Sequence, residues 1–571
     1  NALPAWLPQQ RWFGAKARRI ESARVLDWVE VASSDAKEVA DSAFFGLPGA
    51  APLPPAIFFV EVKYSEGPSD FYQLSIAIGA GTEEIADSPQ SVLATLAFPL
   101  GPAILFDATI LEGFRQALLR LIQQNSSLAL LAAHGGGDAE ADESAVADSS
   151  DATTAKHHLQ PRESPSAGEG APQRGRLDAR ASTAFHQATS TKLGLSRVGS
   201  AEQSNTSILY GDHLILKLFR RIQPGENPEV EIGRFLTEVA RFPHIPPFLG
   251  EIAMTQPGWK KTTVAMLQAM VANKGDGWQW FLDQLASFFP AVAALHDAPE
   301  SPAPGFLTDH RPPSEIMAHA RASLEAAALL GRRTAEMHLA LATPTDDPAF
   351  AAEPSTAKDL ARDAGRIEAQ ISLALNALKA KLADLDDATV EDAGLLLSRR
   401  HNLFARAGAI ATLEAAGLRI RIHGDYHLGQ TLRTGGGAKG TGNFVIIDFE
   451  GEPARSLAER RQKQSPLRDV AGMIRSFSYA AHTGVDRYLT ANPDAGPIAA
   501  WALCWQNTVS AEFLRAYRDT IAARPDLLPP PQPSQELLDG YLLEKALYEL
   551  HYELNNRPSW LRIPLSGILT L

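Results

Sequence analysis

The sequence predicts an α+β protein whose main part has two lobes, a small strand-rich unit followed by a larger helical unit. A single helix interrupts the strand-like runs, and Asn227 and Pro228 supply its N-cap and first-turn proline. From Trp278 onward, apolar residues recur mostly at helical spacing. The short apolar runs typical of strands are 193–198, 207–210, 214–219 and 262–270.

A mixed amino-terminal block precedes the two lobes. Residues 57–62 and 71–76 alternate as half-buried strands do, whereas 111–130 repeats apolar side chains on one helical face. Residues 133–176 are rich in Gly, Ala, Asp, Ser and Pro, and we interpret them as a flexible linker or insertion, because they bury too little surface to offset their ordering entropy. The predicted division is 1–132, 133–176, 177–274 for the small lobe and 275–571 for the large lobe.

The composition is that of a globular protein of two or three domains, because 571 residues exceed what one core holds. Lys and Arg number 53 against 66 Asp and Glu, so the net charge of −13 disfavours nucleic acid and anionic membranes as partners. Cys504 is the single cysteine, which permits no intrachain disulfide. No run reaches the roughly 18 apolar residues of a membrane span and no signal sequence is visible, so we expect a cytoplasmic protein. Because the chain begins with Asn1, we also expect that it was cut from a longer product.

The most informative segment is an apolar strand that ends in His423-Gly424-Asp425, with an amide side chain five positions later at Gln430. A second apolar strand ends in Asp448. This order of parts is that of a kinase catalytic loop, in which one Asp accepts the proton of the attacking hydroxyl, an amide holds Mg²⁺, and a later Asp bridges Mg²⁺ to the phosphates. The segment therefore predicts an ATP- and Mg²⁺-dependent phosphotransferase.

Two other interpretations of these segments were considered. Asp448, Glu450 and Glu452 alternate and can project to one side, where they would repel one another without a cation, but they also fit a solvated strand end. His423 and His427 could form a zinc pair, although no third ligand stands out. Taken together, the two segments favour phosphoryl transfer.

The nucleotide side is expected upstream, around Lys217 in the middle of an apolar strand. A lysine is rarely buried without a partner. We choose Glu231 as that partner and keep Glu229 open, since helical phase does not separate them; a surface lysine on an edge strand is the other interpretation. The loop at 200–207 lacks the glycines of a protein-kinase phosphate loop, so hydroxyl and backbone donors would take their place, including Ser204, Asn205 and Thr206.

Residues 435–440 fit the G-x-G-x-x-G pattern of a dinucleotide site only formally. They connect two strand-like runs and no helix follows them. Pyrophosphate would need a helix N-terminus at this point. We therefore predict a flexible hairpin loop.

Near the carboxyl end, a helix carries aromatic and charged residues on one face. A stripe of aromatic residues is more often core than ligand site, but charged residues rarely share a fully buried face. Aromatic rings with polar tips also suit a sugar. Both interpretations stay open for Tyr541, Glu544, Lys545, Tyr548 and Tyr552.

These motifs together resemble those of bacterial maltokinases. The resemblance rests on segments in the same order along nearly the whole chain outside 133–176, namely 6–14, 202–207, 216–221, 227–228, 423–430, 448–453 and 545–560. It implies a two-lobed, eukaryotic-like kinase fold of the aminoglycoside phosphotransferase type, with an α/β cap subdomain at 1–132. It also implies ATP-dependent phosphorylation of maltose at its anomeric hydroxyl, giving maltose 1-phosphate for α-glucan and glycogen synthesis from trehalose, with trehalose synthase as a fused or associated partner.

The resemblance also implies roles for individual residues. Asp425 would be the catalytic base, Lys217 the phosphate anchor and 268–270 the adenine hinge, with Gln268 and Met270 at the nucleotide. Gln430, Asp448 and Glu450 would hold Mg²⁺. The residues assigned to the sugar are His427, Glu452, Lys545, Tyr548 and Tyr552.

Protein kinases differ from this chain at two of these positions. Gln430 stands where they have Asn, and Asp448-Phe449-Glu450 stands for Asp-Phe-Gly, so the second metal could shift or be absent. The alternative functions are another small-molecule kinase of the same fold, such as a glucosamine kinase, and an inactive kinase-like scaffold.

Overall fold

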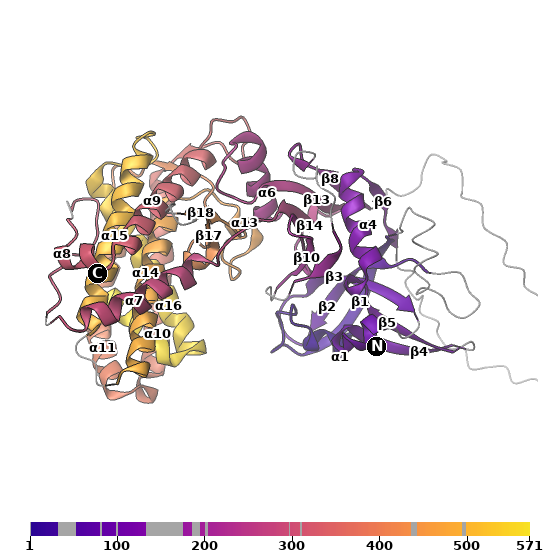
Figure 1. Ribbon diagram of the computed structural model, residues 1–571, viewed down its shortest axis with the longest axis horizontal. Helices are drawn as coiled ribbons and strands as arrows, with labels where there is room; N and C mark the ends of the chain where they lie inside the picture. Colours follow the sequence, from indigo (N-terminus) through magenta and orange to yellow (C-terminus); the bar gives the residue numbers. More distant parts are fainter. Residues whose placement is uncertain are drawn as a thin grey trace, which may run out of the picture.

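The computed structural model contains two bodies, one built of two β-sheets and one mainly of helices (Figure 1). The predicted linker, 133–176, lies outside the described residues except for Gly175 and Arg176. The described residues are 2–31, 53–79, 83–98, 101–132, 175–185, 194–199, 204–295, 297–308, 311–435, 442–493 and 498–571.

The amino-terminal sheet is antiparallel, with the strand order β4-β5-β3-β2-β1-β7. One face is covered by Trp6, Trp12 and Phe13, which pack with Tyr72 of β3. The predicted strands at 57–62 and 71–76 are confirmed as parts of β2 and β3. The elements are α1 (Leu3–Trp6), η1 (Leu7–Gln9), β1 (Ile20–Glu30), β2 (Ala56–Tyr64), β3 (Asp70–Gly79), α3 (Glu83–Ala86), η2 (Pro89–Ser91), β4 (Val92–Phe98), β5 (Gly101–Asp107), η3 (Ala108–Ile110) and β7 (Leu131–Ala132).

The second sheet forms the small lobe, with the strand order β6-β8-β13-β14-β11-β10-β9. Helix α6 begins at the predicted cap, where the Asn227 side chain accepts a hydrogen bond from the Glu229 N–H at 2.8 Å. The strand-like runs of this lobe are confirmed, with ends moved by up to three residues. The elements are β6 (Ser127–Ala129), β8 (Arg176–Ala181), β9 (Ser196–Val198), β10 (Thr206–Tyr210), β11 (Leu214–Leu218), α6 (Pro228–Arg234), η4 (Phe235–Val239), β13 (Phe248–Thr255) and β14 (Thr262–Ala269).

Two elements of the block 1–132 pack with the small lobe as well as with the core of the amino-terminal sheet. Helix α4 (Glu112–Gln123) contacts β8, β9 and β13, and β6 pairs with β8. In that pairing Leu128 lies opposite Leu177, and the Leu130 N–H donates to Gly175 O at 2.8 Å. The described residues on the two sides of 133–174 are therefore held side by side.

The two sheets are joined beside the strand that carries Lys217. Strand β12 (Arg221–Ile222) pairs with β3, and the Gln73 amide donates to the carbonyls of Phe219 and Val264, each at 2.9 Å. The buried Arg220 guanidinium donates to Asp107 Oδ2 at 2.7 Å. The amino-terminal sheet is thereby fixed directly to the small lobe.

The large lobe is a helical bundle in which α15 lies closely against α9 and also packs on α14 (Figure 1). The close approach depends on Gly331 of α9, where an added Cβ would collide with the Phe513 carbonyl of α15. The helices are α7 (Gly277–Val292), α8 (Ser314–His319), α9 (Arg321–Leu341), α10 (Ala357–Ala380), η5 (Leu382–Asp384), α11 (Asp387–Ser398), α12 (Arg400–Ile410), α14 (Leu467–Ala491), α15 (Ile498–Ile521), α16 (Pro531–Asn556), η7 (Pro558–Trp560) and α17 (Arg562–Leu569).

Short elements of the large lobe carry the predicted catalytic segments toward the small lobe. Strands β17 (Thr431–Thr434) and β18 (Asn443–Ile446) form the predicted hairpin, whose loop residues 436–441 lie outside the described residues. The other short elements are β15 (Glu353–Pro354), β16 (Leu418–Arg419), η6 (Leu428–Gln430) and α13 (Leu457–Arg460). In the part of the chain that the structure describes, no helix combines the length and apolar character that a membrane crossing needs.

Candidate functional site

A cleft of about 580 Å³ lies between the two lobes. Met270, at the lobe junction, donates its N–H to His213 O at 2.7 Å. Of the predicted nucleotide contacts at 204–206, Thr206 does not line the cleft. Its buried hydroxyl accepts a hydrogen bond from Arg220 at 2.8 Å. Predicted residues that do line the cleft are Ser204, Asn205, Lys217, Gln268 and Met270 from the small lobe and Asp425, Gln430, Asp448 and Glu450 from the large lobe.

Lys217 is buried and paired, as the sequence predicts, but its partner is Glu229 and not Glu231. The Lys217 Nζ lies 2.6 Å from Glu229 Oε1. The choice of Glu231 was therefore wrong, because its carboxylate binds Arg421 and Arg461 of the large lobe. Residues two positions apart in a helix are rotated by about 200° around its axis, so the side chains of Glu229 and Glu231 face opposite sides of α6. The docking angle of α6 decides which one meets Lys217, and no local pattern encodes that angle.

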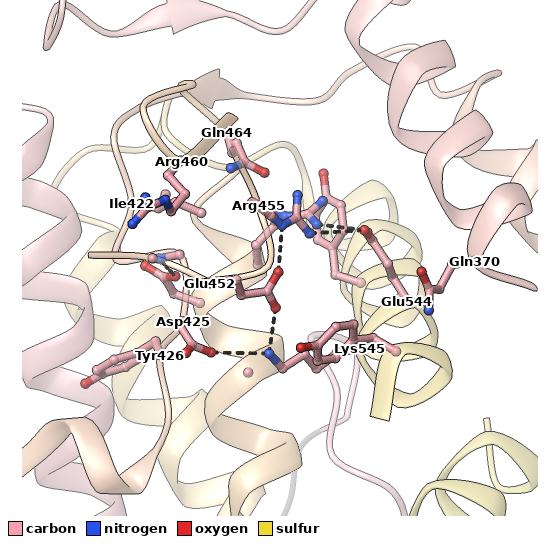
Figure 2. Close-up of a pocket in the computed structure, with 17 residues that line it drawn as sticks. Gln370, Ile422, Asp425, Tyr426, Glu452, Arg455, Arg460, Gln464, Glu544 and Lys545 are labelled. Atoms are coloured by element: carbon pink, nitrogen blue, oxygen red, sulfur yellow. Dashed lines mark hydrogen bonds and ion pairs between the residues drawn. The ribbon is translucent and has the colours of Figure 1, made fainter. Parts of the chain in front are cut away.

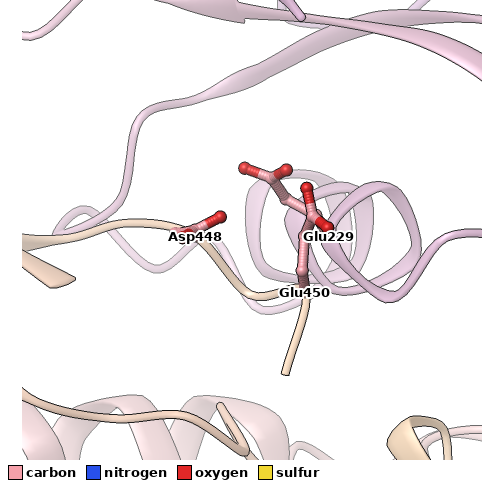
Figure 3. Close-up of side chains that lie close together, drawn as sticks. All are labelled: Glu229, Asp448 and Glu450. Carbon is pink, nitrogen blue, oxygen red and sulfur yellow. The ribbon is translucent and has the colours of Figure 1, made fainter. Parts of the chain in front are cut away.

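The carboxylates of Glu229, Asp448 and Glu450 have oxygens within 4.8 Å of one another (Figure 3). Burial raises the pKa of Glu450, and the charge of Asp448 adds to this effect. Burial also works to raise the pKa of Asp448, but Lys217 at 3.6 Å and the Gln430 amide at 2.9 Å outweigh it, so the pKa lies below its usual range. Crowded, hard oxygen ligands of this kind fit Mg²⁺. Because Glu229 is held by Lys217, Asp448 and Glu450 are the carboxylates left for a metal.

Asp425 lines the cleft between the lobes and also a second, smaller cavity of about 70 Å³. Behind it, the buried His423 ring lies with Nε2 2.9 Å from Ile447 O, next to Asp448. This contact holds the two catalytic segments at a fixed separation. It also occupies a ring nitrogen that the zinc interpretation requires, and the cluster of potential metal ligands found among the described residues contains no histidine.

The smaller cavity holds three of the residues predicted to bind a sugar, Glu452, Lys545 and Tyr548 (Figure 2). Lys545 Nζ lies 2.8 Å from Glu452 Oε1 and 3.4 Å from Asp425 Oδ1. Burial opposes the charge on Lys545, but these carboxylates outweigh it and raise its pKa. For Glu452, burial is likewise outweighed, and Lys545 and Arg455 lower its pKa to about 2. The ion pairs therefore remain formed at neutral pH.

Two other predicted sugar residues lie outside the lining of this cavity. Tyr552 is 43% exposed one turn beyond Tyr548, and the two rings are stacked with centroids 6.5 Å apart. His427 accepts a hydrogen bond from the Gly429 N–H at Nδ1, at 3.1 Å, and so shapes the catalytic loop. Their contacts with a sugar remain predictions.

The amino-terminal sheet matches a known kinase-associated domain. Residues 6–110 match the maltokinase N-terminal cap domain. In this domain the chain is similar to maltokinases, and its fold is that of a capped, two-lobed kinase. The capped two-lobed fold predicted from the sequence is thus confirmed, and the cap match ends just before α4, which packs on the small lobe.

Two glucosamine kinases are similar to this kinase in sequence. The protein from Streptacidiphilus jiangxiensis is 27% identical over 370 residues, covering 64% of this chain and 70% of its own length. The protein from Mycolicibacterium smegmatis is 26% identical over 377 residues, covering 65% and 78%.

Solved structures of glucosamine kinase share the fold. One in complex with glucosamine, ADP and inorganic phosphate has a TM-score of 0.51 at 22% identity, covering 69% of this chain and 81% of that chain. Another, crystal form A, has a TM-score of 0.56 at 18% identity, covering 92% and 90%. The second alignment extends over nearly the whole length of both kinases.

The sequence pattern missed the residue that anchors the catalytic loop, Asp469 of α14. Its buried carboxylate accepts hydrogen bonds from the N–H groups of His423, at 2.8 Å, and Gly424, at 2.9 Å. It also lies 3.1 Å from His338 Nε2, whose other ring nitrogen lies 3.0 Å from the Tyr517 hydroxyl. An aspartate directly before the apolar run 470–474 is the signal that could have pointed to it.

In this kinase, replacing Asp469 with Asn is expected to leave one catalytic-loop N–H facing an NH₂ group. An unsatisfied buried donor costs about 1–3 kcal/mol. We expect unfolding in urea at correspondingly lower concentration and a lower kcat, whereas Asp486→Asn, at an exposed position of the same helix, changes neither. Equal midpoints and equal kcat for Asp469→Asn and wild type would contradict the anchoring role.

A second feature that the sequence missed is the set of arginines around Glu544, which also lines the smaller cavity (Figure 2). Arg366 of α10 and Arg468 of α14 lie 2.8 Å and 2.9 Å from Glu544 Oε1. Burial works to raise the pKa of Glu544, but these arginines lower it to about 2. Three helices that lie far apart in sequence therefore meet at one carboxylate.

This ion cluster predicts a pH dependence of stability in the kinase. Because the folded pKa of Glu544, about 2, lies below the ordinary value of 4.5, the stabilisation is full above pH 4.5 and is lost as the pH falls toward 2. The shift corresponds to about 3 kcal/mol at neutral pH. The difference in free energy of unfolding between wild type and Glu544→Gln should therefore shrink from pH 7 to pH 3. A difference that stays constant over this range would show that Glu544 does not titrate as described.

Proposed function

We propose that the protein transfers the γ-phosphate of ATP to the anomeric hydroxyl of maltose, giving maltose 1-phosphate and ADP. The observation that carries the proposal is the position of Asp425, which lines both the nucleotide cleft and the smaller polar cavity. A base at that junction can reach a hydroxyl in one cavity and face a phosphate in the other.

The nucleotide is proposed to lie along the larger cleft. Adenine would contact 268–270, and Lys217, held by Glu229, would meet the α- and β-phosphates. Asp448 and Glu450, with the Gln430 side-chain oxygen, would hold Mg²⁺, which when bound offsets charge on the phosphates. The paired lysine and intact carboxylates argue against an inactive scaffold.

In this proposal, residues of the protein itself accept the proton of the sugar hydroxyl. Asp425 would orient the sugar hydroxyl and accept its proton as the phosphoryl group transfers. The ammonium of Lys545 lies 3.4 Å from the Asp425 carboxylate. Glu452 would keep Lys545 at that distance through its own ion pair.

Maltose is favoured by the maltokinase-type cap and by the charge of the smaller cavity. Its lining contains four carboxylates and four cationic side chains, so its formal charge is zero. A neutral sugar suits such a lining, because its hydroxyl groups can both donate to carboxylates and accept from arginines. The lining charges are Asp425, Glu452, Asp469 and Glu544 against Arg455, Arg460, Arg468 and Lys545.

Glucosamine is the second candidate, because the two similar proteins named above are glucosamine kinases. Its ammonium group would need a carboxylate in the cavity. Glu544 offers one, since its Oε2 is buried without a hydrogen-bond partner among the described residues. However, three arginines already lie near Glu544, and their positive charge disfavours binding of the glucosamine ammonium there.

A substrate panel with coupled detection of ADP separates the candidates. Maltose, maltotriose, glucose and glucosamine would be compared by kcat/KM at fixed Mg²⁺-ATP. We expect the highest value with maltose. A preference for glucosamine would replace maltose in this proposal and leave the phosphotransfer itself in place. As part of the same proposal, the product would supply α-glucan synthesis from trehalose, with trehalose synthase as the partner.

A further inference from the structure

The short helix α13 and the residue after it contact the small lobe at three points, beside α6 (Figure 1). Leu457 packs on Gly225, where an added Cβ would lie 2.7 Å from the Leu457 Cδ2. Arg460 donates to the Gln223 side-chain oxygen at 2.6 Å. The three contacts join a segment that follows the acidic residues of the cleft to the segment that leads into α6.

The third contact is a two-pronged ion pair between Arg461 and Glu231. Arg461 Nη2 and Nε donate to the two Glu231 oxygens at 2.8 Å and 3.0 Å. Paired N–H donors on one carboxylate fix orientation as well as distance. Because Glu231 is on α6 and Arg461 is in the large lobe, this pair crosses between the lobes.

Glu231 also binds the segment that leads into the predicted catalytic loop. Arg421, two residues before His423 and only 1% exposed, donates to Glu231 Oε2 at 2.8 Å. Two further nitrogens of Arg421 have no hydrogen-bond partner among the described residues. If α6 moved away, this buried guanidinium would lose its carboxylate, which is strongly unfavourable.

The two sides of α6 therefore bind different parts of the protein. Glu229 binds Lys217 on one side, and Glu231 binds the large lobe on the other. Since both are on the first turn of the same helix, fixing Glu231 also fixes Glu229.

We propose that Arg421, Arg461 and the α13 contacts form an interlobe clamp on Glu231, which holds α6 in the position where Glu229 pairs with Lys217. The three charged residues of the clamp are positioning residues, acting on the phosphates through Lys217. The proposal rests on the phosphotransfer function proposed above.

The test compares Arg461→Gln, Arg461→Lys and Glu231→Gln in the full chain, with Glu512→Gln as control. Glu512 pairs with Arg515 on its own helix, so its loss leaves the lobes untouched. Arg461→Gln keeps the buried Arg421 paired and should fold normally, whereas Glu231→Gln leaves that arginine uncompensated. Two readouts are taken, amide hydrogen exchange of peptides covering 228–239 and steady-state kinetics with Mg²⁺-ATP.

For Arg461→Gln we expect exchange in 228–239 to accelerate about fivefold and kcat to fall by a similar factor. The KM for the sugar should stay within about twofold, because the sugar cavity is unchanged. Arg461→Lys should have a kcat between those of Arg461→Gln and wild type, since lysine keeps the positive charge but lacks the paired N–H donors of the guanidinium. Glu231→Gln should show larger effects in both readouts, and Glu512→Gln none.

Exchange rates in 228–239 that equal wild type in both Arg461→Gln and Glu231→Gln would overturn the clamp. So would a loss of kcat that is matched by Glu512→Gln. If wild type transfers no phosphate to any sugar, the proposed function fails, but the exchange experiment still decides whether Glu231 and Arg461 hold α6.

Discussion

Replacing Asp425 with Asn is expected to lower the rate of phosphotransfer by about 10³-fold, within the 10²–10⁴ range that a positioned general base contributes. Asn keeps the size of the side chain but cannot accept a proton at neutral pH. Because Asp425 is partly exposed between two cavities, we expect little change in stability. The KM for ATP should change little, since the nucleotide contacts lie on other residues. Steady-state ADP release at saturating Mg²⁺-ATP and maltose measures both quantities.

A matched control for this variant is Asp519→Asn. Asp519 is exposed on α15 and pairs only locally with Arg515, at 3.0 Å, among the interactions described. It should retain the wild-type rate. Turnover by Asp425→Asn at the wild-type rate would remove Asp425 from the role of base, and a different carboxylate of the cavity would have to be sought.

Replacing Asp448 with Asn is expected to reduce kcat/KM for ATP by about 10²–10³, the range seen when one preorganised electrostatic contact at a reacting centre is lost. Asp448 has φ of +68°, a left-handed backbone conformation that Asn also tolerates. The loop should therefore keep its path. What changes is charge, because the carboxylate 3.6 Å from Lys217 and within 4.8 Å of Glu450 becomes neutral.

Calorimetry separates a metal role for Asp448 from a purely structural one. Wild type should bind ATP more tightly with Mg²⁺ than without it, and Asp448→Asn should lose most of that difference. Asp519→Asn again provides the control for a surface carboxylate. If Mg²⁺ strengthened ATP binding equally in wild type and Asp448→Asn, Asp448 would not be a metal ligand.

Local patterns in the sequence predict much of this site. The buried Lys217 and the helix cap at Asn227 each depend on neighbouring residues, and the structure places them as expected. The strand predicted before His423-Gly424-Asp425 is shorter than expected, because β16 covers only Leu418–Arg419 and 421–423 are irregular. A short apolar strand with a charged residue can be predicted from the pattern of the few residues around it. The two-lobed layout follows from the order of these segments.

Tertiary docking decides the parts that the sequence did not predict. Whether Glu229 or Glu231 meets Lys217 depends on the angle at which α6 packs, and the large-lobe arginines that bind Glu231 are at 421 and 461. The Glu544 cluster likewise joins residues that are 76 and 178 positions apart in sequence. The register by which β6 joins β8 also depends on a partner almost fifty residues away.

The central claim is that the two cavities meeting at Asp425 hold the donor and the acceptor of one phosphoryl transfer. Phosphorus NMR of the purified protein with Mg²⁺-ATP and maltose tests it directly. We predict loss of the γ-phosphate signal together with a new phosphomonoester coupled to the anomeric proton of the sugar. Release of the γ-phosphate only as inorganic phosphate, or no change in ATP with any sugar of the panel, would contradict the account.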